Sequence, residues 1–478
     1  MKFPNLMYID GEWTQASDSA TLDIIDPATE ERIDTVPVAT SADLDRALEV
    51  AERAWKTWRE VDAWTRSAAV RRVAELIRAR VDEIALCMTE EQGKPLAEAR
   101  SEVMAAADQF DWCADEARRI YGRVIDGHSR ANRLLVIRQP IGPVAAFSPW
   151  NFPALLSSRK IAPALAAGCS IIVKPAREAP RTTLCLAQAC HDAGIPKGVI
   201  NVVTGNSSMI SKHLCNSPII RKVTLTGSVP VGREILHLCA DGVKPVTMEL
   251  GGNNPVLVFE DADVERAAEI AARGKFRNNG QVCIAASRFY VQESVAKRFT
   301  ARFVEIARSL RQGDGRDPNT EVGPLANLRR LEATDALVQD AAGKGAVIAC
   351  GGRRSPEFKK GYFYKPTVLT GVNDTMTIMK EEPFCPVAPI AAFTDLDDAL
   401  RQANGTEFGL AAYVFTSNTR TAFIASEGLE AGMVGVNHLL LATAEIPFGG
   451  MKSSGFGREG GAEGIEHYTV AKYVNILL

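Results

Sequence analysis

Two short segments of this chain carry a thiol and a carboxylate in settings that suit covalent catalysis. Cys283 follows a glycine-containing turn at residues 276–282, and Glu249 stands just before the pair Gly251-Gly252. A thiolate can attack a carbonyl carbon, and a carboxylate can take the proton from the thiol or from a water molecule. Together the two side chains predict a reaction that passes through a thiohemiacetal or a thioester.

Neither segment is sufficient alone. The chain has 10 cysteines, and an isolated cysteine is usually a small buried hydrophobe. A single glutamate before two glycines usually lies in a solvated turn. The cysteines form no CxxC pair and no zinc-type spacing with histidine, so we expect reduced thiols, a cytoplasmic location and no metal.

Composition excludes several classes of function. The chain has 478 residues, of which 46% are hydrophobic and 24% charged, as in ordinary globular proteins. This length predicts two or three domains. The net charge of -3 gives no basic footprint for nucleic acid. The N-terminus has no apolar signal core, and no stretch approaches ~18 consecutive apolar residues, so we expect no membrane association.

The pattern of apolar residues predicts a parallel α/β architecture. Residues 41–119 are helical in pattern, with a helix start at Ser41. Beyond them, short apolar runs alternate with helical stretches, first up to residue 245 and again after residue 252. The expected strands are 134–137, 144–147, 170–173, 199–203, 222–225, 255–259, 289–291, 346–348 and 387–390. We expect the tail from residue 466 to end as a strand that extends the sheet of another subunit.

Three segments are candidates for binding a dinucleotide. The GxGxxG at 455–460 follows no predicted strand and opens no long helix, so we interpret it as a loop. Thr226-Gly227-Ser228 joins a predicted strand to a predicted helix, where it either binds a phosphate or forms a routine turn capped by Ser228. Lys174 ends a buried strand and either contacts a ribose or phosphate or is simply solvated, which is the commoner outcome for a single lysine.

In their order along the chain these runs resemble the aldehyde dehydrogenase superfamily over essentially the full length. The matching runs are Phe147-Ser148-Pro149-Trp150-Asn151-Phe152-Pro153, Lys174-Pro175, Thr226-Gly227-Ser228, Glu249-Leu250-Gly251-Gly252, Gly280-Gln281-Val282-Cys283, Glu382-Pro383-Phe384-Cys385-Pro386 and Pro447-Phe448-Gly449-Gly450. Each run is modestly specific, and the complete ordered set is highly specific.

The resemblance implies a fold with two Rossmann-like α/β domains and a small β oligomerisation region. The cofactor domain would comprise residues 1–117 and 138–246, and the catalytic domain 247–440. Residues 118–137 and 441–478 would form the oligomerisation region of a homodimer or homotetramer, together with a tail that covers the active site.

The resemblance also implies roles for individual residues. Cys283 would be the nucleophile, Asn151 and the Cys283 backbone N–H the oxyanion hole, and Glu249 the base that activates water. Lys160 and Glu459 would relay protons. The cofactor residues would be Ser148, Pro149, Trp150, Lys174, Ala176, Arg177, Gly205, Thr226, Gly227, Ser228, Val231, Leu250, Gly251, Glu382 and Phe384. The substrate residues would be Arg159, Arg277, Thr443 and Phe448.

One departure from the family pattern concerns the choice between NAD and NADP. Relatives that prefer NAD carry a glutamate three residues after the lysine, where it binds both ribose hydroxyls. Here Arg177 stands at that place and the glutamate is displaced to Glu178. A guanidinium can pair with a 2′-phosphate, which slightly favours NADP over NAD.

Two arginines bear on the substrate. Arg159 and Arg277 stand where succinate semialdehyde dehydrogenases grip the distal carboxylate, which predicts a carboxylated semialdehyde and disfavours betaine aldehyde. The alternative is that they form internal salt bridges and that the substrate is an aromatic or aliphatic aldehyde. A CoA-acylating enzyme is disfavoured because Glu249 is present, and a non-catalytic protein because Cys283 and Asn151 are retained as well.

Overall fold

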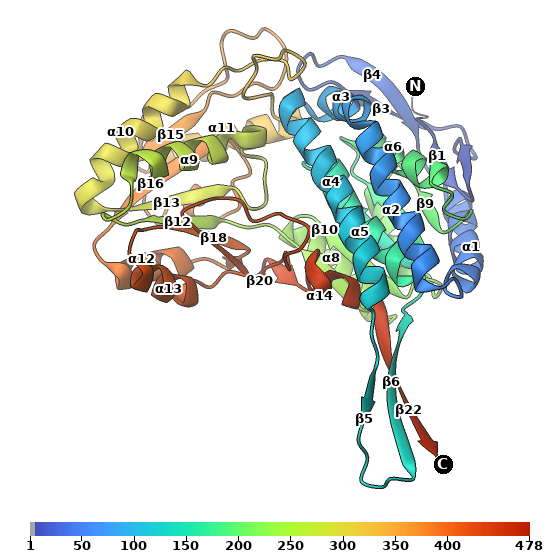
Figure 1. Ribbon diagram of the computed structural model, residues 1–478. Helices are drawn as coiled ribbons and strands as arrows, with labels where there is room; N and C mark the ends of the chain where they lie inside the picture. The colour runs from blue at the N-terminus through green and yellow to red at the C-terminus, as the bar shows by residue number, and fades with distance from the viewer. Residues whose placement is uncertain (1–4) are drawn as a thin grey trace.

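The computed structural model describes residues 5–478 as two sheet-centred lobes and a narrow arm (Figure 1). The first lobe is built on an eight-stranded sheet in the order β2-β1-β9-β8-β7-β10-β11-β21. Its strands are β1 (Met7–Ile9), β2 (Glu12–Thr14), β7 (Val144–Ser148), β8 (Ile171–Pro175), β9 (Ile200–Val202), β10 (Lys222–Thr226), β11 (Val246–Glu249) and β21 (Gly455–Phe456). Strands β7 to β11 are parallel.

Helices cover both faces of this first sheet. One face packs on a cluster from helices α2 to α6, and the other on α1, α7 and α8. Their bounds are α1 (Ser41–Trp58), α2 (Ala63–Ala79), α3 (Val81–Gln92), α4 (Leu96–Glu116), α5 (Pro153–Ala167), α6 (Pro180–Asp192), α7 (Ser207–Asn216) and α8 (Val229–Ala240). Helix α1 begins at Ser41 as predicted, and its N-cap is Thr40, which forms a capping box with Asp43.

The second lobe has a seven-stranded sheet in the order β14-β15-β16-β13-β12-β18-β19. Its strands are β12 (Asn254–Val258), β13 (Ala286–Gln292), β14 (Val347–Cys350), β15 (Thr367–Thr370), β16 (Val387–Phe393), β18 (Ala411–Phe415) and β19 (Met433–Val436). The covering helices are α9 (Val264–Phe276), α10 (Glu293–Ser309), α11 (Leu328–Gly343), α12 (Leu396–Asn404) and α13 (Thr419–Gly428). Because β11 still pairs with β10, the chain passes from the first sheet to the second at residues 250–253.

The arm is a three-stranded antiparallel sheet that projects away from both lobes, with the C-terminus near its tip (Figure 1). It contains β5 (Arg123–Ile125), β6 (Asn132–Pro140) and β22 (Thr469–Leu477). The tail is therefore a strand, as predicted, and it pairs along its length with β6 of its own chain. Since β22 is an edge strand, its other side has no partner within the sheet.

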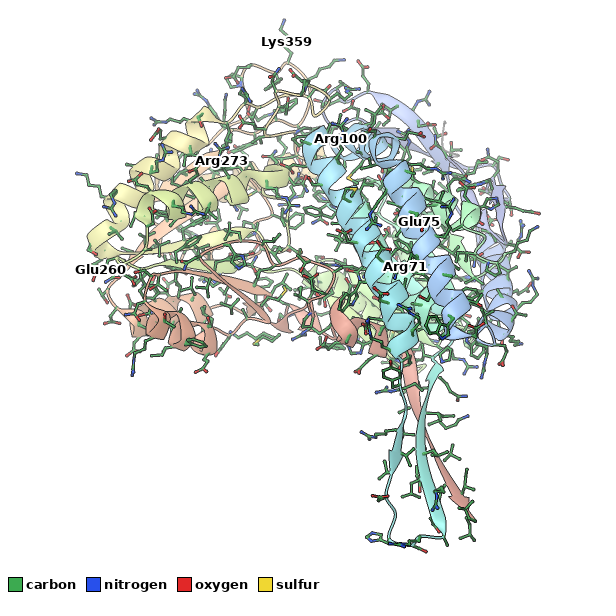
Figure 2. The ribbon with its side chains drawn as sticks, viewed as in Figure 1. Arg71, Glu75, Arg100, Glu260, Arg273 and Lys359 are labelled. Atoms are coloured by element: carbon green, nitrogen blue, oxygen red, sulfur yellow. The ribbon has the colours of Figure 1, made fainter. Side chains whose placement is uncertain are left out.

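Charges of both signs cover the outside of the two lobes (Figure 2). Arg71 on α2, for example, pairs with Asp111 and Asp115 on α4. Helices long and apolar enough to cross a membrane do not occur within residues 5–478.

Candidate active site

The strand order of the first sheet creates a binding crevice. From β7 the chain moves outward through β8 to β9, and it then returns to the other side of β7 with β10 and β11. Between β7 and β10 the direction of winding therefore changes, and in open α/β sheets ligands bind at such switch points, beyond the carboxyl ends of the strands. Ser148, Thr226 and Glu249 end three of these strands.

A cavity of about 560 Å³ opens at this edge of the sheet. It is lined by most of the residues that the sequence predicted for cofactor binding. These are Ser148, Pro149, Trp150, Lys174, Ala176, Arg177, Thr226, Gly227, Ser228, Val231, Leu250, Gly251, Glu382 and Phe384. Cys283, Glu249, Asn151 and Phe448 line the same cavity, so thiol, carboxylate and carboxamide open onto one space.

Not all predicted residues lie on the wall of this cavity. Gly205, Thr443, Arg159, Arg277, Lys160 and Glu459 are outside its lining. Gly205 has φ +126°, and a Cβ there would come within 2.9 Å of the backbone of Ala39, which gives this glycine a packing role. Residues that the sequence analysis missed include Ser207, Ser208, Glu234, Arg329 and Arg330.

The cavity has the groups that a dinucleotide needs. Ser228 is the N-cap of α8 but makes no side-chain capping bond, which leaves its hydroxyl and the helix N-terminus open toward an anion. Lys174 is buried rather than solvated, and its Nζ contacts the hydroxyl of Ser207. Burial lowers the pKa of Lys174 to about 8, and Glu178 opposes this change.

Gly251 and Gly252 leave room for the carboxylate of Glu382 beside the cavity. A Cβ on Gly251 would lie only 2.2 Å from Oε2 of Glu382, and the N–H of Gly252 donates to Oε1 of Glu382 at 3.2 Å. Burial raises the pKa of Glu382 to about 7. Phe384, with φ +46°, packs edge-on against Trp150 with ring centroids 5.5 Å apart.

The nucleophile candidate is held by its backbone. Cys283 lies between a short helix (η2, Arg277–Gly280) and β13, and Asn254 donates to its carbonyl oxygen at 2.8 Å. Burial, together with the charges of Glu382 and Glu249, raises the pKa of Cys283 to about 12, although Arg159 opposes the rise. The thiol therefore stays protonated near neutral pH until a base removes its proton.

Glu249 is suited to be that base. Its side chain is 2% exposed, and neither carboxylate oxygen has a hydrogen-bond partner. Burial, and next the charge of Glu459, raise the pKa of Glu249 well above the ordinary value, while Lys160 and Arg159 oppose the rise. A raised pKa makes a carboxylate a stronger base once it is ionised.

Behind Glu249 lies a second ionic group. The ammonium of Lys160 contacts the carboxylate of Glu459 and donates to Oγ1 of Thr226 at 2.7 Å. The GxGxxG segment brings Glu459 here because Gly455 pairs with Glu249 in strand β21, so the segment begins as a strand and not as the loop that the sequence predicted. None of its residues lines the cavity. One oxygen of Glu459 is buried without a partner, which leaves a place for a proton from Glu249.

The two predicted substrate arginines differ sharply. Arg159 is 1% exposed, its Nε and Nη2 have no hydrogen-bond partner, and its guanidinium lies 4.0 Å from the ring centre of Phe448. Arg277 is exposed and lies 5.2 Å from the ring centre of Phe152. Neither arginine forms a salt bridge with any residue in 5–478, so the internal salt bridges considered as an alternative are absent there.

Clusters of three or more histidine, cysteine or acidic side chains that could hold a metal are absent from residues 5–478. The cavity is lined by a thiol, a buried carboxyl group and a carboxamide, and the buried cation of Arg159 lies outside its lining.

Comparisons with known proteins agree with this geometry. The model of the aldehyde dehydrogenase family matches residues 13–474. The chain is 44% identical to a glutarate-semialdehyde dehydrogenase of Pseudomonas putida, with 99% of this chain and 98% of that protein covered. It is 42% identical to the NADP(+) succinate-semialdehyde dehydrogenase of Escherichia coli, with 98% and 97% covered.

A solved structure gives the same result at the level of the fold. The crystal structure of succinate-semialdehyde dehydrogenase from Burkholderia pseudomallei superposes with a TM-score of 0.98 at 43% identity and covers 100% of this chain and 98% of that one. The predicted fold class and the resemblance are thus confirmed, and the chain belongs to the aldehyde dehydrogenase family.

Proposed function

We propose that this enzyme oxidises an aldehyde with a distal carboxylate, such as succinate semialdehyde or glutarate semialdehyde, to the dicarboxylic acid. The observation that carries the proposal is the guanidinium of Arg159, buried with two nitrogens unpartnered. A guanidinium cannot shed its charge in a protein, so burial without a partner is costly unless a ligand supplies an anion. The names of the relatives support the same class of substrate.

In the proposed mechanism, Glu249 removes the thiol proton of Cys283 and the sulfur attacks the aldehyde carbon. The Nδ2 of Asn151 donates one hydrogen bond to the carbonyl of Gln281 at 3.1 Å, and its second N–H is available for the oxyanion. A preorganised donor of this kind contributes roughly 2.7–4 kcal/mol to the transition state. A nicotinamide dinucleotide bound in the cavity would accept the hydride.

Glu249 acts a second time when the thioester is hydrolysed. It takes a proton from water as the water attacks the acyl carbon, and the S–C bond breaks to regenerate the Cys283 thiol. Before this step, the proton that Glu249 took from the thiol must leave, and the partnerless oxygen of Glu459, beside Lys160, can receive it. The proton that Glu249 takes from water then returns to the sulfur. The presence of this base supports hydrolysis over transfer to CoA.

Arg177 supports NADP as the better cofactor. It lines the cavity, is exposed, and forms no ion pair with any residue in 5–478. The carboxylate of Glu178, the displaced glutamate, accepts a hydrogen bond from Nδ2 of Asn327 at 3.2 Å. It therefore already has a partner other than the ribose of the cofactor. The residues present thus fit a 2′-phosphate better than a free 2′-hydroxyl.

A steady-state assay tests the proposal. Succinate semialdehyde, glutarate semialdehyde, benzaldehyde and butanal are each supplied with NADP or NAD, with and without CoA. We expect the highest kcat/KM with a carboxylated aldehyde and NADP, free acid as the product, and no requirement for CoA. A higher kcat/KM with butanal or benzaldehyde would refute the substrate class and favour an aliphatic or aromatic aldehyde.

We further propose that the arm makes the enzyme a homodimer or homotetramer in the cytoplasm. Large apolar side chains are exposed along it, among them Val124 (71%), Tyr473 (59%) and Leu477 (76%), and the free edge of β22 can accept another strand. Light scattering after gel filtration should show two or four chains per particle. A monomer at micromolar concentration would refute this assembly.

A further inference from the structure

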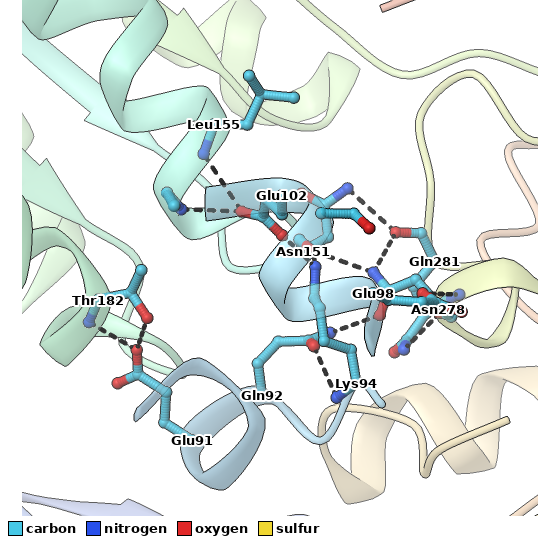
Figure 3. Close-up of polar contacts among 12 residues, drawn as sticks. Glu91, Gln92, Lys94, Glu98, Glu102, Asn151, Leu155, Thr182, Asn278 and Gln281 are labelled. Carbon is cyan, nitrogen blue, oxygen red and sulfur yellow. Dashed lines mark hydrogen bonds and ion pairs between the residues drawn. The ribbon is translucent and has the colours of Figure 1, made fainter. Parts of the chain in front are cut away.

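The loop that joins α3 to α4 contacts the backbone of Asn151 through Lys94 (Figure 3). Lys94, 1% exposed, donates from Nζ to the carbonyl oxygen of Asn151 at 2.7 Å. The same ammonium contacts the carboxylate of Glu102 and lies 3.9 Å from the ring centre of Phe152. Lys94 therefore fixes both residues of the Asn151–Phe152 peptide.

Glu102 connects Lys94 to helix α5. Its Oε1 accepts from the backbone N–H of Ala154 at 2.9 Å and of Leu155 at 3.2 Å, in the first turn of α5. A carboxylate there satisfies N–H groups that the helix itself leaves free. Since α5 also carries Arg159 and Lys160, the pair of Lys94 and Glu102 ties the oxyanion donor to the helix of the proposed substrate cation.

Asn278 joins Asn151 to the segment that leads to the nucleophile. Its Nδ2 donates to the carbonyls of Asn151 at 3.0 Å and of Gln281 at 3.3 Å. Its Oδ1 accepts from Nε2 of Gln92 at 3.0 Å, and its N–H donates to Glu98 at 2.9 Å. Its φ of +46° is one that asparagine tolerates better than most residues.

The carbonyl of Gln281 closes the network. It accepts from Nδ2 of Asn151 as well as from Asn278, so Asn151 is tied at its main-chain oxygen and at its side-chain nitrogen. Only one amide hydrogen remains free, and these bonds determine where it points. A displacement of about 1 Å of a catalytic group can reduce a rate about 100-fold.

We propose that Lys94 and Asn278 are positioning residues of the oxyanion hole, acting through Asn151 without touching the reacting atoms. The inference rests on the proposed function only in that Cys283 attacks a carbonyl carbon and Asn151 stabilises the resulting oxyanion. It is independent of which aldehyde or cofactor the enzyme uses.

Two reactions of Cys283 separate positioning from general damage. With p-nitrophenyl acetate, the sulfur attacks the ester carbonyl, the C–O bond breaks, nitrophenolate leaves, and the thiol proton passes to Glu249; this acylation needs the oxyanion hole. With iodoacetamide, the sulfur displaces iodide from a saturated carbon and no oxyanion forms. Both rates are measured at one pH, the second by mass spectrometry of the Cys283 peptide, because the chain has 10 cysteines.

Lys94→Met and Asn278→Gly are the test variants. In Asn278→Gly, the glycine backbone can still adopt φ +46°, and the ion pair of Lys94 and Glu102 is unchanged. This variant therefore tests the proposal even if Lys94→Met does not fold. We expect each variant to lower the acylation rate about 10- to 100-fold. The alkylation rate should stay within about twofold of the wild type, since it needs only the thiol and its base.

Glu91→Gln is the matched control (Figure 3). Glu91 is a 1% exposed carboxylate on α3 that accepts from Thr182 N–H at 2.8 Å and Oγ1 at 2.6 Å in the first turn of α6. It resembles Glu102 in this capping role, but its partners are in α6 rather than beside Asn151. We expect this variant to melt at a lower temperature and to keep both rates.

Loss of acylation and alkylation to the same extent in a folded Asn278→Gly variant would overturn the proposal, as would unchanged acylation. A wild-type enzyme that is alkylated but never acylated would also overturn it, because Asn151 would then not serve as an oxyanion donor. Normal acylation without oxidation of any carboxylated aldehyde would instead refute the proposed substrate and leave the positioning roles supported.

Discussion

Replacing Arg159 with methionine should make the enzyme less active on carboxylated aldehydes without making it less stable. Arg159 has no hydrogen-bond partner at Nε or Nη2, and its guanidinium rests on the ring of Phe448. Losing a hydrogen bond to a charged group costs about 1.5–3 kcal/mol, which is roughly a 10- to 100-fold loss in kcat/KM. That loss should appear with succinate semialdehyde and be absent with butanal.

The same prediction also concerns the stability of the Arg159→Met variant. Methionine preserves an apolar contact with Phe448 and removes a buried charge that forms no salt bridge, so the free energy of unfolding should stay equal or rise. Arg288 provides the matched control, because it is 2% exposed and donates to the carbonyls of Asn253, Gln402 and Ala403. Arg288→Met leaves these acceptors unpaired and should cost at least about 3 kcal/mol.

Urea unfolding of both variants and kcat/KM for both aldehydes complete the experiment. If Arg159→Met destabilises the protein as much as Arg288→Met, the Arg159 guanidinium is structural. If it impairs butanal and succinate semialdehyde equally, Arg159 does not bind the substrate carboxylate. Either result would return the substrate to an aldehyde of unknown class and leave the role proposed for Cys283 untouched.

Four further predictions concern charged groups at or near the cavity. Glu249→Gln should give slow but complete single-turnover reduction of the cofactor and then stall, whereas rapid steady-state turnover would refute Glu249 as the hydrolytic base. Because the folded-state pKa of Glu249 is raised, the wild type should lose stability relative to this variant as pH rises above about 4.5, and a melting-temperature difference that does not change with pH would contradict this. Arg177→Glu should raise KM for NADP and lower KM for NAD. A wild-type enzyme that already prefers NAD would refute the role proposed for Arg177. Arg277→Ala should reduce kcat/KM for succinate semialdehyde less than Arg159→Met does, since Arg277 is exposed; the reverse order would make Arg277 the main carboxylate ligand.

Local sequence patterns predicted the central strands of both sheets well. The apolar run 144–147 became β7 (Val144–Ser148), and 387–390 became the first half of β16, because buried parallel strands are apolar on both faces. Strands β18 and β19 were not recognised from the sequence. The pairing of β22 with β6 was also missed, since it joins segments more than 300 residues apart and no local pattern encodes it.

The candidate site was predictable to the extent that it depends on ordered motifs. Those motifs placed Cys283, Glu249 and Asn151 around one cavity. The supports behind them were not predictable, because Gln92 and Asn278 are 186 positions apart and contact each other only through the tertiary fold. The available signals were weak: two asparagines before Gly280, and a lysine after Gly93.

Buried charges in this molecule are compensated in different ways, and the differences bear on the proposed function. Lys94 and Lys160 each have a carboxylate partner, as buried ions usually do. The Nζ of Lys275 is buried without a hydrogen-bond partner, but burial lowers its pKa to about 8, so it can become neutral. Arg159 cannot do so, and Glu249 can be neutral only at the expense of its function as a base. In the proposed function their partners come with the reaction: an anion of the substrate for Arg159, and the thiol proton or a water molecule for Glu249.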